Sequence, residues 1–157
     1  MRALVVAIAL WSTSARADER EGVRAEVTRH HLLYVEALGK AGPYGIGYEY
    51  AITARLGLGT AASYLRAGGD ETWTASPYVH AWLGGPMFCE LGAIFAHSHI
   101  ASPVMGWGGA SDSGGGGFAT LGWQYVRGVF VVRASGGVAF GEGGLGPMLG
   151  IAVGARP

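Results

Sequence analysis

From Leu32 to the C-terminus, apolar residues recur at every second position in short runs that glycine, proline and polar residues separate. Such alternation is typical of β-strands that have one apolar and one polar face. No stretch of this region keeps the period of an amphipathic helix. The pattern predicts eight strands, at about 31–39, 44–50, 55–66, 72–83, 87–99, 116–126, 129–140 and 146–154.

The connections between these strands alternate in length. The second, fourth and sixth are tight, near Ile52, Gly85 and Arg127-Gly128, whereas the fifth, over about 101–116, is the longest. Short turns at one end and longer loops at the other are typical of outer-membrane barrels, whose short turns face the periplasm. We therefore predict an all-β fold, an eight-stranded antiparallel up-and-down transmembrane β-barrel. One long external loop is expected at 100–117.

The two faces of the predicted strands differ in chemistry. In 87–99, Leu91, Ala93 and Phe95 share one face, and Glu90 shares the other with Gly92. Only 14% of the chain is charged, and it has 29 glycines, so the polar face is too poor in charge for the exterior of a soluble barrel. The opposite arrangement places the apolar face against lipid and Glu90 inside a narrow barrel, because a carboxylate in lipid is costly.

Several charged positions fall on the predicted inner face. The turns place Glu49 opposite Arg55, His80 opposite Glu90, and Arg133 opposite Gly122. An interior polar network would satisfy buried charges and fix the strand register. We expect it to contain Glu36, Glu49, Arg55, His80, Glu90 and Arg133.

Aromatic residues on the lipid-facing side gather towards the two ends of the strands. Two aromatic girdles mark the interfaces of a membrane barrel. The outer girdle is predicted to contain Tyr44, Tyr64, Trp73 and Phe140. The periplasmic girdle is predicted to contain Tyr50, Trp123 and Tyr125.

The N-terminus has the features of an export signal. Arg2 precedes an apolar run from Ala3 to Trp11, and Ala15-Arg16-Ala17 fits a cleavage site before Asp18. The predicted organisation is a signal peptide at 1–17, a polar lead-in at 18–30 and the barrel at 31–157, located in the outer membrane. Membrane lipids are the expected partners, and the formal charge of zero gives no basis for binding nucleic acid.

One stretch has residue types found in hydrolases and metal sites. His97, Ser98 and His99 lie beside the long loop, which contains Asp112. Neighbouring strand residues point to opposite faces, so Ser98 cannot easily bond either ring, and no third metal ligand accompanies the histidines. We predict no catalytic residues, no metal site and no cofactor.

The stretch SPYVHAWLGGPMFCELGAIFAHS, residues 76–98, resembles the central hairpin of small eight-stranded outer-membrane barrels. That class includes the transmembrane domain of outer-membrane protein A and the lipid A deacylases. The resemblance covers about 31–155 and implies the same fold. Deacylase activity relies on a His-x-Ser-Asn motif on a late strand. Here the late strand has Ser135 without a preceding histidine, so the catalytic residues are not carried over.

Three functional hypotheses follow. The first is a non-enzymatic outer-membrane barrel with a packed polar interior. Its role would be structural, or would be contact with an extracellular partner through loop 100–117. The second is a membrane-embedded lipid-modifying hydrolase that uses Ser98 or Ser135. The third is a soluble periplasmic lipocalin-like carrier with its apolar face turned inward.

Overall fold

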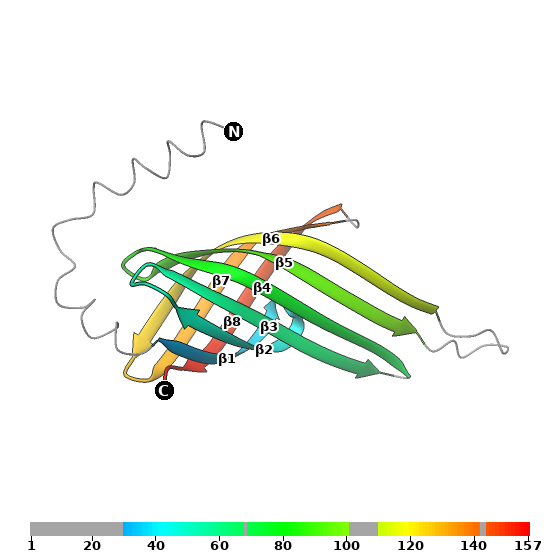
Figure 1. Ribbon diagram of the computed structural model, residues 1–157, viewed down its shortest axis with the longest axis horizontal. Coiled ribbons are helices and arrows are strands. Elements are labelled where there is room, and N and C mark those ends of the chain that lie inside the picture. The colour runs from blue at the N-terminus through cyan, green and yellow to red at the C-terminus, as the bar shows by residue number, and fades with distance from the viewer. Residues whose placement is uncertain (1–29, 68, 101–109, 142–143) are drawn as a thin grey trace, which may run out of the picture.

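The computed structural model describes residues 30–67, 69–100, 110–141 and 144–157 (Figure 1). The predicted signal peptide and all but the last residue of the lead-in lie outside these ranges. Apolar residues alternate with small or polar ones along eight segments, and each of these segments is a strand. They are β1 (His31–Gly39), β2 (Gly42–Ala51), β3 (Leu56–Ala67), β4 (Asp70–Gly84), β5 (Met87–Ile100), β6 (Ala110–Arg127), β7 (Phe130–Gly141) and β8 (Gly144–Ala155). No helix among the described residues is long and apolar enough to cross a membrane.

The strands form a closed antiparallel barrel in which each pairs with its neighbours in the sequence. Closure comes from β1 and β8, where Val35 lies opposite Val153 and Ala37 opposite Ile151. Closure removes the sheet edges from the body of the barrel, so its backbone hydrogen bonds are satisfied without water. The predicted fold class and strand order are therefore confirmed.

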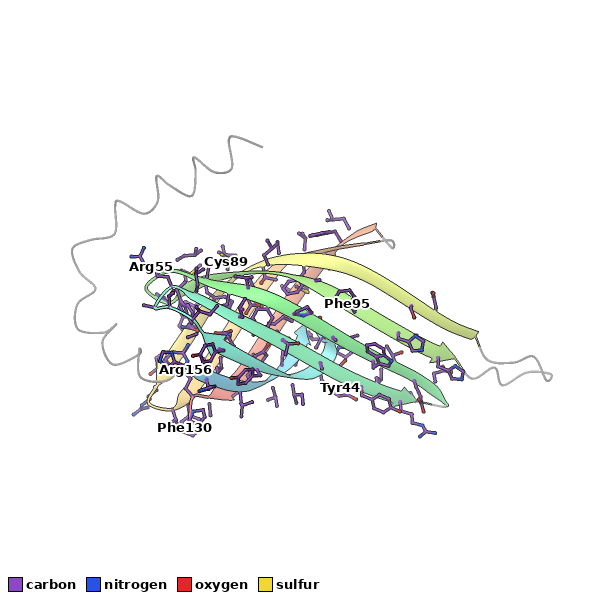
Figure 2. All side chains as sticks on the ribbon, in the orientation of Figure 1. Tyr44, Arg55, Cys89, Phe95, Phe130 and Arg156 are labelled. Carbon is purple, nitrogen blue, oxygen red and sulfur yellow. The ribbon has the colours of Figure 1, made fainter. Side chains whose placement is uncertain are left out.

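The apolar face of the barrel is its outer surface. Ile46, Leu91, Leu149 and Ile151 expose 60–69% of their surface. Figure 2 shows Tyr44 and Phe130 at the outer surface of the wall. A continuous apolar exterior on a closed barrel suits contact with lipid. The carrier hypothesis required this face to point inward, and the structure contradicts that arrangement.

The interior is filled by aromatic rings that lie over glycines of the next strand. Four ring–glycine pairs are directly opposite in the register, and a Cβ on each glycine would overlap the ring. At Gly92 it would also lie 2.4 Å from the Pro77 carbonyl oxygen. The pairs are Tyr34 with Gly47, Tyr78 with Gly59, Phe88 with Gly122 and Phe118 with Gly92. An eight-stranded barrel is wide enough only for such side chains. The glycines therefore determine how the core is packed.

The two ends of the barrel differ. At the terminal end, where His30 and Pro157 lie, connections are short. At the opposite end, called the far end here, β3, β4, β5 and β6 extend together beyond β2 and β7 (Figure 1). Pairing of β3 with β2 stops at Ala62, and pairing of β6 with β7 stops at Gly116. Residues 63–67, 70–74, 95–100 and 110–115 form a four-stranded extension, called the projecting sheet below.

The predicted loop at 100–117 is too long. Residues 110–117 belong to β6, where Gly114 lies opposite Ala96 and Gly117 opposite Ala93. The glycine-rich composition indicated a loop, but glycine accepts extended geometry when a neighbouring strand supplies the hydrogen bonds. Residues 101–109 of the predicted loop lie outside the described residues.

Cys89 provides a test of the orientation of the wall. It lies on the outer face of β5, opposite Ala81 and Leu121. After reconstitution in lipid bilayers, we expect a water-soluble maleimide to leave Cys89 unlabelled and to label it fully after unfolding. A Cys89→Ser/Ser113→Cys variant is the matched control, because Ser113 lies on the projecting sheet and should be labelled in bilayers. Fast labelling of Cys89 in the intact bilayer would contradict a lipid-facing wall.

Candidate functional site

An arginine on β7 clamps a carboxylate on β2 across the barrel interior. Arg133 Nη1 and Nη2 donate to the two Glu49 carboxylate oxygens at 2.7 and 2.9 Å, and Arg133 Nε donates to Gln124 Oε1 at 3.2 Å. The side chains of Arg133 and Glu49 are 5% and 2% exposed. Two parallel charge-assisted hydrogen bonds at this depth are a strong interaction with a defined geometry.

A lysine from the first turn reaches two further carboxylates. Lys40 Nζ donates to Glu36 Oε1 at 3.1 Å and to Glu90 Oε2 at 2.9 Å. It also lies over the ring of Tyr78, 4.6 Å from the centroid. The interaction connects β1, the β1–β2 turn and β5, so one cation holds both sides of the barrel together.

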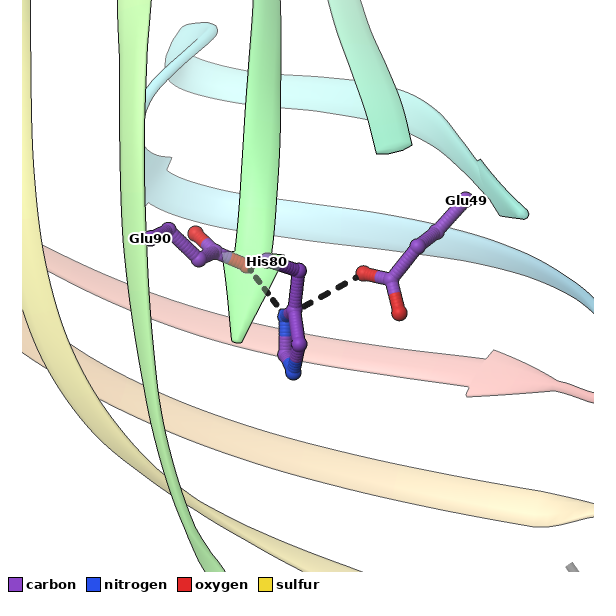
Figure 3. A group of neighbouring side chains, drawn as sticks. All are labelled: Glu49, His80 and Glu90. Carbon is purple, nitrogen blue, oxygen red and sulfur yellow. Dashed lines mark hydrogen bonds and ion pairs between the residues drawn. The ribbon is translucent and has the colours of Figure 1, made fainter. Parts of the chain in front are cut away.

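His80 connects the two ion pairs. Its Nδ1 lies 3.3 Å from Glu49 Oε2 and 3.3 Å from Glu90 Oε1 (Figure 3). Carboxylate oxygens only accept hydrogen bonds, so Nδ1 carries the proton. The ring is fully buried and stacks on Phe88 with 4.7 Å between centroids. A continuous series of contacts, the interior charge chain, therefore links Gln124, Arg133, Glu49, His80, Glu90, Lys40 and Glu36.

Glu49, His80 and Glu90 bring three potential metal-ligand atoms within 4.8 Å of one another. Both carboxylates are already engaged, Glu49 by Arg133 and Glu90 by Lys40. A divalent cation at this position would stand beside two fixed positive charges in a medium of low polarity, where repulsion is strong. The donor set fits an internal ion network better than a metal site.

The charge chain contains five of the six residues expected from the sequence: Glu36, Glu49, His80, Glu90 and Arg133. The expectation for Arg55 is wrong, since Arg55 is exposed in the turn 52–55. Thr53 Oγ1 accepts hydrogen bonds from the Arg55 and Leu56 backbone N–H groups, which widens the turn. Strand β3 consequently starts later, and Glu49 lies opposite Gly59.

The residue that lies opposite Arg133 also differs from the one predicted from the sequence, Gly122. The turn between β6 and β7 is formed by Gly128 and Val129 rather than by Arg127 and Gly128. Shifting the turn centre by one residue moves the register by two, so Arg133 lies opposite Gln124 and Gly122 lies opposite Ser135. This shift gives Arg133 Nε its amide partner.

Lys40 was not expected inside the barrel, because it belongs to a turn. The turn folds inward, and its carbonyl oxygens accept hydrogen bonds from hydroxyls of β3 and β4; the β3 donor is Ser63 Oγ, which bonds Ala41 O at 2.6 Å. Ser76 Oγ donates to Lys40 O at 2.6 Å, and Thr74 Oγ1 donates to Ala41 O at 2.7 Å. Lys40 and Ala41 are 5% and 1% exposed. The turn closes the interior below the projecting sheet.

A small cavity lies beside the charge chain. Its volume is about 10 Å³, and Glu36, Lys40 and Ser135 are among the residues that line it. This volume is close to the minimum for one water molecule. Glu36 Oε2, which is buried, has no hydrogen-bond partner among the described residues. The cavity is too small for a substrate or lipid chain.

All seven aromatic residues assigned to the two girdles lie exposed on the outer face. Their exposed fractions range from 42% for Tyr50 to 51% for Tyr64 and Tyr125. Tyr44 Oη donates to the Tyr64 carbonyl at 2.6 Å, which connects two of the outer-girdle residues. The predicted outer girdle is Tyr44, Tyr64, Trp73 and Phe140. The predicted periplasmic girdle is Tyr50, Trp123 and Tyr125.

The serine and histidines at 97–99 do not form a catalytic pair. Ser98 Oγ bonds Thr72 Oγ1 at 3.1 Å on the inner face of the projecting sheet. His97 Nδ1 bonds Ser113 Oγ at 2.6 Å on the other face, where its ring also packs against Trp73. Opposite faces of one strand separate the nucleophile from its base.

No protein-family model matches the chain, and no curated protein matches it significantly. Several solved structures are similar in fold. The N-terminal β-barrel domain of Pseudomonas aeruginosa OprF is 22% identical, with a TM-score of 0.54, over 81% of this chain and 97% of that one. Ail, the attachment invasion locus protein of Yersinia pestis, is 15% identical, with a TM-score of 0.51, over 81% and 95%. A further structure shows Ail in complex with the heparin analogue sucrose octasulfate.

Proposed function

We propose that this chain is a non-enzymatic integral outer-membrane barrel that presents the projecting sheet at the cell surface to an extracellular partner. The observation that carries the proposal is the asymmetry of the far end, where 63–67 and 110–115 continue beyond the neighbouring strands (Figure 1). Strands that extend past a closed barrel add exposed area without adding to the core, so contact with a partner is the role that explains them.

The interior supports an anchoring role rather than transport or catalysis. The charge chain and the ring–glycine pairs fill the barrel at mid-height, and the inward turn at Lys40 and Ala41 covers them. The similarity in fold to OprF and Ail supports the outer membrane as the location. In that membrane the far end would face outward, because the short turns and the described termini lie at the other end.

The charge of the projecting sheet bears on the choice of partner. It carries one arginine, Arg66, and three acidic residues, Asp70, Glu71 and Asp112. With neutral histidines its net charge is −2. A surface of this sign repels polyanions. A sulfated sugar, such as the one bound to Ail, is therefore a poorer match for this sheet than a neutral or basic polypeptide.

A trimmed variant tests the proposal. Ser63 lies directly opposite Thr74, and Ala96 lies opposite Gly114. Replacing 64–73 and 97–113 each by Asn-Gly, which forms tight hairpin turns, should leave a complete barrel without the projecting sheet. Intact cells that carry the full chain should be retained on at least one member of an immobilised panel of extracellular-matrix and serum proteins. We expect cells with the trimmed chain to lose that retention.

The comparison requires equal amounts of both chains in the outer membrane, measured by heat-modifiable migration on gels. A similar degree of retention for the two chains on every panel member would contradict the proposal. A trimmed chain that fails to reach the membrane would be replaced by one in which only 97–113 is exchanged, which leaves the β3–β4 hairpin complete.

A further inference from the structure

The two free edges of the projecting sheet are not equivalent. Past Ala62, the free edge of β3 carries Arg66, and its Tyr64 carbonyl accepts a hydrogen bond from Tyr44. Basic side chains and local caps are among the means by which proteins prevent strand addition. The free edge of β6, residues 110–115, carries serines, glycines and Asp112 with no basic residue. Within the described part of the chain, no strand pairs with it on the β7 side.

An apolar groove lies where β6 and β7 separate. Its volume is about 370 Å³, and Ile94, Ala96, 114–116, 139–141 and 144–146 line it. One wall is therefore the free edge of β6, and the other is the tip of the β7–β8 hairpin, which turns away from β6 (Figure 1). The groove and the unpaired backbone thus form one continuous surface.

For two glycines of the groove, no contact with another described residue explains the lack of a side chain. A Cβ at Gly114 or Gly146 would meet no atom within 4 Å, and neither residue has the positive φ that favours glycine. By contrast, Gly116 is required by close packing, because its Cβ would lie 2.4 Å from the Phe140 carbonyl oxygen. Glycine inside a strand often marks the close approach of another backbone. Side chains at 114 and 146 would fill the groove.

Asp112 lies two residues from Gly114 on β6, so both side-chain positions belong to the inner face of the sheet. Asp112 is exposed, and no cation pairs with it among the described residues. A strand added along the β6 edge would place one of its residues opposite Gly114 and another, two positions away, opposite Asp112. The first position requires an apolar side chain of moderate size and the second a basic one.

We propose that the β6 edge and the adjoining groove bind an extended polypeptide segment of a partner by strand addition, with an apolar and a basic residue two positions apart. This inference rests on the proposed function and specifies its partner. Backbone hydrogen bonds to 110–115 supply affinity, the groove at Gly114 receives the apolar side chain, and Asp112 pairs with the basic one. A lipid acyl chain would fill the groove without using the backbone edge or Asp112.

A designed peptide series tests the proposal with the full chain in lipid nanodiscs. The probes are acetyl-Thr-Lys-Thr-X-Thr-Lys-Thr-amide, in which X is Ala, Val or Leu. The sequence reads the same in both directions, so it fits parallel or antiparallel addition. We expect saturable NMR shifts of backbone amides at 112–116, 141 and 144–146, together with slower amide exchange at alternate residues of 110–115.

Matched probes and variants separate the contributions. The variant Asp112→Asn should weaken binding about three- to fivefold, because an exposed ion pair contributes little. Replacing both lysines of the probe by glutamate reverses its charge and should weaken binding at least about tenfold, which is about 1.4 kcal/mol. Gly114→Leu fills the groove and should weaken it similarly. Gly136→Leu is the control, since residue 136 lies on the outer face of β7, outside the groove, and should leave binding unchanged. Two probes methylated at complementary sets of alternate peptide nitrogens each block one hydrogen-bonding edge, and at least one of the two should lose binding.

The outcomes are decisive. If no member of the series gives saturable shifts, the proposal is overturned. If both methylated probes bind as well as their parent and amide exchange is unchanged, the groove takes an apolar group such as an acyl chain, and strand addition is also overturned. If the trimmed chain loses surface binding while Gly114→Leu keeps it, the proposed function stands and this inference fails.

Discussion

Replacing Arg133 by methionine is expected to lower the free energy of unfolding by about 3–5 kcal/mol. Arg133 is 4% exposed, and its permanently charged guanidinium donates a hydrogen bond to each Glu49 carboxylate oxygen. Methionine fills similar space without charge, so the main cost is an uncompensated carboxylate in the barrel interior. Denaturant unfolding of the protein in detergent micelles or bilayers, followed by tryptophan fluorescence, gives this difference from the transition midpoint.

Arg55→Met is the matched control for Arg133→Met. Arg55 is exposed in the turn 52–55, and surface substitutions of this kind change stability by less than about 0.5 kcal/mol. The double variant Glu49→Met/Arg133→Met removes both charges and should be more stable than Arg133→Met alone. Equal losses for Arg55→Met and Arg133→Met would show that the ion pair with Glu49 has no special role.

The sequence predicts the fold and the interior residues better than it predicts their partners. Alternation with a period of two assigns Glu36, Glu49 and Glu90 to the inner face regardless of the turn geometry. Pairing depends on the number of residues in each turn, and a hydroxyl such as that of Thr53 is enough to widen a turn. For this reason the sequence predicts Arg55 opposite Glu49, whereas the residue that lies there is Gly59, four positions later.

Lys40 shows a second limit of sequence reasoning. A lysine between two glycine-containing segments is typical of a solvent-exposed turn. Its burial depends on charges supplied by Glu36 and Glu90 and on hydroxyls of β3 and β4 that hold the turn. These groups are brought together only by barrel closure. The surplus of carboxylates over cations in the predicted interior was the available signal, because a buried charge requires a partner.

The extent of β6 was missed for a related reason. The sequence at 110–117 contains four consecutive glycines, which lower strand propensity. Pairing with β5 along 93–100 overrides that propensity. The reason for glycine differs along this run. A side chain at 116 or 117 would overlap Phe140, whereas a side chain at 114 would enter open space.

Gly59→Ala is expected to destabilise the barrel by about 1–3 kcal/mol, although it adds a single methyl group. The new Cβ would lie 2.2 Å from the Tyr78 ring carbon that carries the hydroxyl. That hydroxyl bonds Tyr34 Oη at 2.9 Å and Glu49 Oε2 at 3.2 Å. The ring cannot move away without losing these bonds, and the unfolding midpoint in denaturant should fall accordingly.

Gly136→Ala is the matched control, with an opposite expected sign. Its Cβ would face lipid at an ordinary distance of 3.4 Å from Leu149, so the variant should be neutral or stabilised by up to about 1 kcal/mol through the unfolded state. Tyr78→Leu removes the ring and leaves room at Gly59, so Gly59→Ala should cost little in that background. If Gly59→Ala costs the same with and without the Tyr78 ring, the loss comes from the backbone of β3. The ring–glycine pair would then not determine the packing of the interior.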